Sequence, residues 1–178
     1  MTTTKYYFET SRLLITEWHS IDNNPHLQIN LADTIKKILT PSVTHSLPAD
    51  WQNIHTDDHA KNWIKARDSE GVTLLIIEKQ TNIPIGLFIL TKDEDLSCEA
   101  ALRIGYILEE PAWGKGFASE LIEGFIVWCS HNKISLLTAG IDKGNIASKR
   151  VLEKNGFTCS LQNSSEDNLF FQYYINPK

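Results

Sequence analysis

The sequence has little of what marks a secreted, membrane-spanning or nucleic-acid-binding protein. Its three cysteines, Cys98, Cys129 and Cys159, are an odd number without C-x-x-C spacing. This excludes a disulfide framework, so we expect buried thiols and a reducing, cytoplasmic compartment. No apolar run is long enough to span a membrane, and the residues after Met1 do not resemble a signal peptide, so we expect none. A formal net charge of -5 argues against nucleic acid as the main partner, because nucleic acid needs a basic surface.

What is present is an ordinary globular composition. Hydrophobic residues make up 42% and charged residues 22% of the 178 positions, which suits one domain, residues 1–178, with a substantial core. The apolar spacing predicts a mixed α/β fold, with a mixed sheet of about seven strands and about four helices. The expected order is strand, two helices, three strands, helix, strand, helix and two strands.

Capping and turn signals bound the expected elements. Asn24 followed by Pro25 indicates an N-cap and the first helical position, and residues 42–52 are expected to be irregular. The strands on either side of the third helix should be parallel, because one crossover connects them. Helices are expected at residues 24–39, 56–70, 117–132 and 145–155. Strands are expected at residues 12–18, 73–78, 83–90, 99–108, 136–141, 157–161 and 168–175.

The most informative stretch is a glycine-rich turn between the strand at 99–108 and the helix at 117–132. Gly114 and Gly116 flank Lys115, and glycine allows a tight turn and the close approach of a ligand to the backbone. The helix that follows leaves N–H donors unpaired in its first turn, where its dipole favours negative charge. Basic residues gather in this part of an acidic chain: Lys115, Lys143, Lys149, Arg150 and Lys154. The pattern indicates a phosphate-binding turn, with a plain connecting loop as the alternative.

A dinucleotide-binding site is a rival interpretation of the same turn. Gly114, Gly116 and Ser119 occupy the positions of a G-x-G-x-x-G motif, and Asp142 ends the next strand, where a ribose-binding acid would stand. Ser119 replaces the third glycine, however, and too little chain remains after Asp142 to complete a doubly wound sheet. We therefore do not expect a dinucleotide here.

A metal site has weaker support. His55 and His59 are spaced i, i+4 with Asp58 beside them, a spacing that can hold a metal on one helix face. No further ligand pair is indicated nearby, and a polar helix start explains the stretch equally well. We expect no metal.

Several segments together resemble the GNAT superfamily of acetyl-CoA-dependent N-acetyltransferases. The chain is most similar to its RimJ/RimL branch, which includes ribosomal-protein-alanine and -serine N-acetyltransferases. The resemblance covers essentially the whole chain and implies the GNAT fold. The segments that carry it are Thr10–Ile15, Ile85–Gly86, Gly105–Leu108, Trp113–Glu120 and Asn145–Phe157.

The resemblance implies acetyl-CoA as co-substrate, with no metal. The turn would bind the CoA pyrophosphate through backbone N–H groups, the strand before it would pair with the pantetheine arm, and Asn145 would hydrogen-bond that arm. The implied cofactor-binding residues are Ile107, Leu108, Trp113, Gly114, Lys115, Gly116, Phe117, Ala118, Ser119, Asn145, Ser148 and Lys149.

The resemblance also implies a direct attack of an amine on the thioester, with a proton donor for the leaving thiolate. Glu153 stands where many members carry a catalytic tyrosine, which leaves Ser148 as the candidate acid. The alternative for Ser148 is a helix first-turn residue whose hydroxyl bonds the backbone.

The general base is open. Arg103 stands where many relatives carry an acid, so a base at that position is in doubt. Glu99 lies on the same strand face as Arg103 by period-two alternation and is our candidate. Glu109 and Glu110 are further alternatives, although plain surface charge explains each of them, and Tyr106 is expected to pack rather than react.

The acceptor is a primary amine of open identity. A protein N-terminus is the first expectation, and a small amine such as a polyamine, an amino acid derivative or an antibiotic is the second. A non-catalytic acyl-CoA-binding module is the rival from another class. We expect no nucleic acid or membrane partner, and either a monomer or a homodimer. The two N-terminal helices, the loop at 40–51 and the last hairpin are expected to shape the acceptor site.

Overall fold

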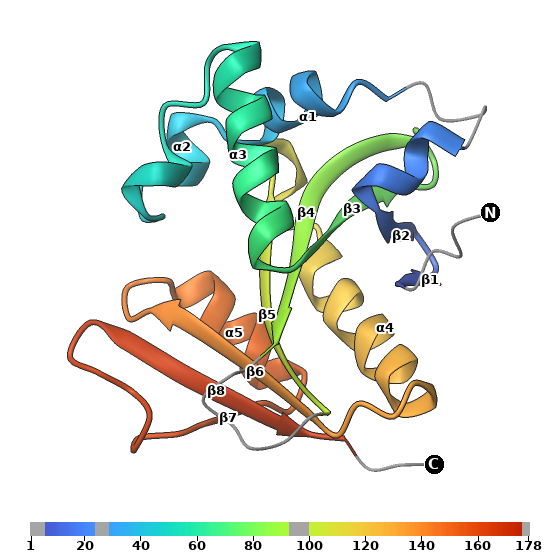
Figure 1. Cartoon of the computed structure of the whole chain (residues 1–178). Coiled ribbons are helices and arrows are strands. Elements are labelled where there is room, and N and C mark those ends of the chain that lie inside the picture. The colour runs from blue at the N-terminus through green and yellow to red at the C-terminus, as the bar shows by residue number, and fades with distance from the viewer. Residues whose placement is uncertain (1–5, 24–28, 93–99, 176–178) are drawn as a thin grey trace. The chain divides into compact units, whose positions relative to one another are not determined.

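The structure, a computed structural model, describes residues 6–23, 29–92 and 100–175. Figure 1 labels its elements in chain order. The strands are β1 (Tyr7–Glu9), β2 (Leu13–Glu17), β3 (Val72–Glu78), β4 (Ile83–Lys92), β5 (Ala101–Leu108), β6 (Leu136–Asp142), β7 (Thr158–Cys159) and β8 (Asn168–Tyr174). The α-helices are α1 (Leu31–Ile38), α2 (Pro41–Thr44), α3 (Asp57–Glu70), α4 (Phe117–His131) and α5 (Ile146–Lys154). None of the helices within the described ranges is long and apolar enough to cross a membrane.

The strands form a mixed sheet in the order β1-β2-β3-β4-β5-β6-β8-β7. β5 and β6 are parallel, as the crossover between them predicts, whereas β1–β2, β2–β3, β6–β8 and β7–β8 are antiparallel. The mixed α/β prediction is confirmed, and the described residues contain one strand and one helix more than expected. The additions are β1 and α2, which have three and four residues and therefore carry almost no periodic signal.

Two predicted boundaries are wrong near the N-terminal helices. Asn24 and Pro25 lie outside the described residues, and α1 begins only after Asn30, whose side chain accepts a hydrogen bond from the N–H of Asp33 (3.1 Å). The stretch expected to be irregular contains α2, which begins at Pro41 because a proline without an N–H suits the first helical position. A 3-10 helix, Ala49–Trp51, follows.

Other signals located their elements well. Thr56 caps α3 by accepting a hydrogen bond from the N–H of His59 (3.1 Å), and α3 ends at Gly71 as predicted. The strand expected at 157–161 shortens to the two residues of β7.

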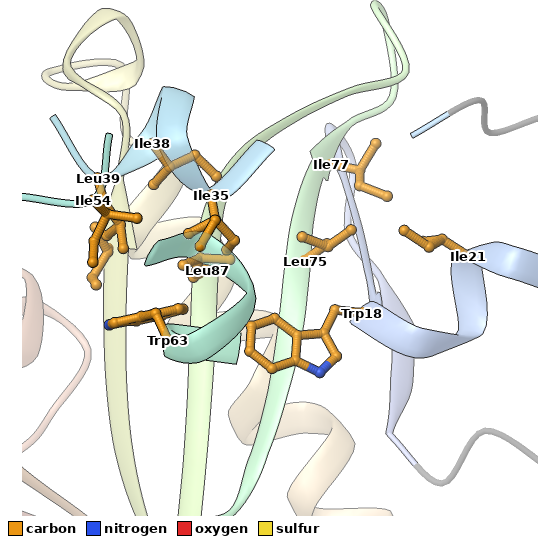
Figure 2. Packing of buried hydrophobic residues seen from close by; sticks show 12 residues of the cluster. Trp18, Ile21, Ile35, Ile38, Leu39, Ile54, Trp63, Leu75, Ile77 and Leu87 are labelled. Carbon is orange, nitrogen blue, oxygen red and sulfur yellow. The ribbon is translucent and has the colours of Figure 1, made fainter. Parts of the chain in front are cut away.

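The chain forms two compact units, and the first consists of Met1–Ile89 and Tyr106–Phe117. Its core lies between α1 and α3 on one side and strands β3, β4 and β5 on the other. Figure 2 shows aromatic and aliphatic side chains gathered in one cluster, which come from these elements, from the 3-10 helix Trp18–Asn23 and from the segments that follow α1 and precede α3. The buried members are Trp18, Ile21, Ile35, Ile38, Leu39, Ile54, Ala60, Trp63, Leu75, Ile77, Leu87 and Ile107.

The second unit consists of Leu90–Gly105 and Ala118–Lys178. Its β6 pairs with β8 along the whole strand, from Leu136 opposite Tyr174 to Asp142 opposite Asn168. α4 buries an apolar stripe in which the ring of Phe125 stacks on that of Trp128, with 5.6 Å between their centroids. The second unit therefore contains buried apolar side chains of its own.

One glycine in the first unit is required by a close backbone approach. A Cβ on Gly86 in β4 would clash with the carbonyl oxygen of Ile107 in β5 and would lie 2.7 Å from Cδ2 of Leu108. Neither partner can withdraw cheaply, because one is backbone and the other is a buried leucine. Gly86 therefore lets the backbones of β4 and β5 approach closely beside Ile107.

We expect Gly86→Ala to lower the free energy of unfolding by about 1–3 kcal/mol, because the added methyl overpacks a filled site. Chemical denaturation monitored by circular dichroism measures this. The matched control is Gly140→Ala in β6, where a Cβ would meet no atom within 4 Å. Equal stability of the two variants would contradict the close approach.

Candidate active site

The glycine turn has the backbone geometry that the sequence predicts. β5 ends at Leu108, a 3-10 turn follows, and α4 begins at Phe117. Gly114 and Gly116 have φ values of +71° and +81°, in the left-handed region that favours glycine. The turn is therefore a specific conformation rather than a flexible connection.

The turn also leaves backbone donors available. In the part of the chain that the structure describes, the N–H groups of Gly114, Lys115 and Gly116 have no hydrogen-bond partner. A Cβ at Gly114 would meet nothing within 4 Å, and one at Gly116 would meet only Nη2 of Arg12, at 3.6 Å. Both glycines are exposed, so a ligand could approach the backbone here.

Side chains from two segments hold the turn in place. Trp113 donates its indole N–H to the carbonyl of Leu108 (2.8 Å), and this bond connects the two ends of the 3-10 turn. Arg12, the residue before β2, donates from Nη1 to the carbonyl of Lys115 (3.0 Å). Its guanidinium also lies over the ring of Phe117, 4.4 Å from the centroid. Nothing in the sequence indicated that Arg12 contacts a turn about a hundred residues away.

Glu109 and Glu110 begin the turn, and one of them is not the surface charge that the sequence favoured. Glu109 is only 8% exposed, and its carboxylate pairs with Nζ of Lys37 in α1 (2.9 Å). The exposed Glu110 accepts a hydrogen bond from the hydroxyl of Ser42 in α2 (2.7 Å). Sequence reasoning missed Lys37 and Ser42, because a pairing between distant segments has no local signature.

In the second unit, Asn145 caps α5. Its Oδ1 accepts a hydrogen bond from the N–H of Ser148 (3.0 Å), so the cap uses the backbone of Ser148 and not its hydroxyl. Among the residues described, the Ser148 hydroxyl has no hydrogen-bond partner. This argues against the alternative in which that hydroxyl only bonds the backbone. Lys149 lies one residue further along and faces Glu153 at 3.8 Å, a weak exposed pair.

Ser119, in the first turn of α4, is also engaged in the second unit. Its Oγ accepts a hydrogen bond from Nδ2 of Asn155, the residue that ends α5 (3.3 Å). Ala118 precedes it and is partly buried. Asp142, the acid that a dinucleotide site would need, instead accepts a hydrogen bond from the N–H of Gly144 (2.7 Å) and so supports the loop before α5.

The remaining candidates fall into three groups. Glu99, the candidate base, lies outside the described residues, as does Cys98. Ile107 and Leu108 are buried at the end of β5. The guanidinium of Arg103 lies 5.8 Å from the ring centroid of Phe170, a contact within the second unit.

Among the described residues, the histidine pair and the two cysteines Cys129 and Cys159 show no arrangement for metal or nucleophilic chemistry. Nδ1 of His59 lies 3.0 Å from the carbonyl of Asn53, which fixes its ring at the start of α3. Within residues 6–23, 29–92 and 100–175, no group of three or more potential ligands could hold a metal ion. Cys129 is buried, and burial raises the pKa of its thiol, so it is a poor nucleophile. Cys159 is exposed, so the expectation of buried thiols is wrong for that residue.

The structure thus brings the predicted residues together in two places. In the first unit, Ile107 and Leu108 lead into the turn from Trp113 to Phe117, which Arg12 holds. In the second unit, Asn145, Ser148 and Lys149 share the first turn of α5, and Ser119 contacts its end.

Comparison with known proteins identifies the family. The family model described as the acetyltransferase (GNAT) domain matches residues 12–158. No curated protein matches the sequence.

Solved structures share the fold at low identity. An acetyltransferase of the GNAT family from Bacillus anthracis has a TM-score of 0.70 and 19% identity, over 96% of this chain and 98% of the other. RimL, a ribosomal L7/L12 alpha-N-protein acetyltransferase solved with coenzyme A, has a TM-score of 0.73 and 16% identity, over 97% of this chain and 100% of the other. YncA of Salmonella typhimurium, solved with its cofactor acetyl-CoA, has a TM-score of 0.63 and 18% identity, over 94% and 96%.

The family match extends from Arg12, which contacts the turn, to Thr158 in β7, and so includes both places where the predicted site residues gather. The chain therefore belongs to the acetyltransferase (GNAT) domain family.

Proposed function

We propose that this GNAT acetyltransferase transfers the acetyl group of acetyl-CoA to a primary amine, and that the turn from Trp113 to Phe117 holds the pyrophosphate of the donor. The reaction class follows from the family. The observation that carries the placement is the row of N–H groups at Gly114, Lys115 and Gly116, which lack partners among the described residues. Such a row directly before a helix N-terminus is suited to an anion.

The residues present fit a phosphate ligand. The turn residues from Trp113 to Gly116 are exposed, and no neighbouring side chain occupies the positions where the two glycines would carry a Cβ. Lys115 adds a positive charge within the turn itself. A pyrophosphate could therefore accept hydrogen bonds from the backbone and gain from a nearby cation.

Further binding roles rest on the resemblance and remain part of the proposal. In the first unit, the backbone at Ile107 and Leu108 would pair with the pantetheine arm. In the second unit, Asn145, Ser148 and Lys149 would contact the donor from the first turn of α5, and Ala118 and Ser119 from the first turn of α4.

The chemistry needs a neutral amine whose nitrogen attacks the thioester carbonyl carbon. A carbon–nitrogen bond forms, the carbon–sulfur bond breaks, and the sulfur leaves as a thiolate that takes up a proton. We propose the Ser148 hydroxyl as the proton donor, because its backbone and not its side chain serves the helix cap. Glu99 remains our proposal for the base that receives the proton of the attacking amine.

We propose the N-terminal amine of a protein as the acceptor. The support is the similarity to the RimJ/RimL branch in the segments quoted above, together with the fold shared with RimL. A small amine is the second candidate, and an acyl-CoA-binding module without activity is the third.

We expect Gly116→Glu to abolish acetyl-CoA binding while the fold survives, because it places a negative charge where the pyrophosphate would lie. Thermal unfolding measures this, since acetyl-CoA at a hundredfold its dissociation constant should stabilise the wild-type protein by about 2.7 kcal/mol. Gly116→Ala has the same backbone strain without the charge, so its affinity for acetyl-CoA should lie between those of the wild type and Gly116→Glu. Gln162→Glu adds an exposed charge elsewhere and should bind normally. Wild-type binding by Gly116→Glu would refute the placement of the pyrophosphate.

We expect Ser148→Ala to lower kcat about a hundredfold or more, which is the usual contribution of a general acid. The dissociation constant of CoA should change less than kcat, because the helix cap uses the backbone N–H of Ser148 and survives the substitution. Steady-state kinetics and calorimetry separate the two quantities. Ser148→Thr, which restores a hydroxyl, should recover part of the rate. An unchanged kcat in Ser148→Ala would remove this residue from the chemistry.

We expect peptides with a free N-terminal serine or alanine to be acetylated with a kcat/KM about tenfold or more above that of spermidine. A site built for a protein N-terminus would also contact the peptide beyond its amine, and these contacts would stabilise the transition state. Release of free CoA and mass spectrometry of the product measure this. The same peptides with a blocked N-terminus and one internal lysine are the control and should not react. Faster acetylation of spermidine would replace the protein acceptor with a small amine.

A further inference from the structure

Arg12 makes two contacts with the glycine turn, one on each side of Gly116. Before that glycine, Nη1 of Arg12 donates to the carbonyl of Lys115 at 3.0 Å. After it, the guanidinium lies over the ring of Phe117, 4.4 Å from the centroid. Both are contacts that a planar, permanently charged guanidinium makes well.

The backbone that carries Arg12 is itself held. The carbonyl of Arg12 accepts a hydrogen bond from the N–H of Lys79 (2.9 Å), and Nζ of Lys79 donates to the carbonyl of Thr10 (2.8 Å). The next residue, Leu13, pairs with Glu78 at the end of β3. Arg12 itself precedes β2, but hydrogen bonds from Lys79 on either side hold the backbone that carries its guanidinium.

The bond to Lys115 fixes the direction of the next N–H group. In a planar trans peptide the C=O and N–H bonds point in opposite directions. Because the carbonyl of Lys115 points at Arg12, the N–H of Gly116 in the same peptide points away from Arg12. That N–H is one of the donors without a partner in the described part of the chain.

The same bond removes an acceptor from the site. Carbonyl oxygens carry partial negative charge, so a turn that binds an anion must direct them elsewhere. Arg12 donates a hydrogen bond to the carbonyl of Lys115 and so places a positive charge beside that carbonyl. The conformation that presents donors is thereby favoured before any ligand binds.

We propose that Arg12 is a positioning residue for the pyrophosphate of acetyl-CoA, acting by holding the Lys115–Gly116 peptide so that its N–H faces the ligand. The inference rests on the proposed function of the turn. Arg12 would affect binding of the CoA moiety and leave the chemical step alone.

The test compares two acetyl donors, acetyl-CoA and S-acetylpantetheine, which lacks the pyrophosphate. We expect Arg12→Gln to raise the dissociation constant of CoA about tenfold or more, since a hydrogen bond from a charged donor is lost. Its kcat at saturating acetyl-CoA should stay within about twofold of wild type, and its kcat/KM with S-acetylpantetheine should also match wild type. A purely structural role would lower activity with both donors alike.

Two further variants sharpen the result. Arg12→Lys keeps the charge but cannot stack and hydrogen-bond with one planar group, so its CoA binding should also be weakened. Lys65→Gln removes one positive charge from the exposed face of α3 in the same unit and should bind CoA like wild type. Full binding by Arg12→Lys together with weak binding by Arg12→Gln would assign the effect to charge and overturn the positioning role.

The outcomes separate this inference from the proposed function. Equal CoA binding by wild type and Arg12→Gln, or equal losses with both donors, would overturn the inference and leave the proposed function standing. A wild-type protein that neither binds CoA nor uses acetyl-CoA would overturn the proposed function, and the inference with it.

Discussion

In the first unit, Gly86 lets the carbonyl of Ile107 approach the backbone of β4 closely, one residue before β5 ends. Immediately beyond it, the N–H of Glu109 donates to the β4 carbonyl that precedes Gly86, at 2.9 Å. Trp113 then bonds back to Leu108, so the turn begins from a fixed point. The proposed pyrophosphate site therefore begins from a point where the backbones of β4 and β5 pack closely together.

Charge around the turn is balanced by contacts from distant segments. Two carboxylates, Glu109 and Glu110, come directly before a turn that we propose binds an anion, and bare negative charge there would repel it. Lys37 neutralises the buried Glu109, and Ser42 donates a hydrogen bond to Glu110. Arg12 adds a cation that donates a hydrogen bond to the turn itself. An acidic chain can thus offer a locally favourable site for a phosphate.

The sequence was sufficient for features that depend on local chemistry. Gly114 and Gly116 adopt the left-handed backbone that only glycine accepts readily, and Thr56 and Asn145 cap helices with short polar side chains. The parallel pairing of β5 and β6 followed from the single crossover between them. Each of these depends on neighbouring residues or on chain connectivity, which a single sequence displays directly.

Features that depend on contacts between distant residues could not be predicted in this way. Arg12 and Lys37 are ordinary charged residues in sequence, and only the fold brings them to the turn. The burial of Glu109 is of the same kind, since a glutamate next to a proline-containing turn normally indicates exposed charge. Asn30 caps α1, whereas the sequence favoured Asn24; both residues have the same side chain, so the residue type alone does not choose between them.

The ion pair between Glu109 and Lys37 of α1 also limits which segments of the first unit can be exchanged with those of a relative. The N-terminal helices are expected to shape the acceptor site, so they are the natural segment to transplant from a relative with another acceptor. A graft that omits the cation at Lys37 would leave Glu109 as a buried, unpaired carboxylate beside the turn, a costly arrangement. The N-terminal helices therefore cannot be replaced without affecting the turn, unless the grafted segment supplies its own positive charge to pair with Glu109.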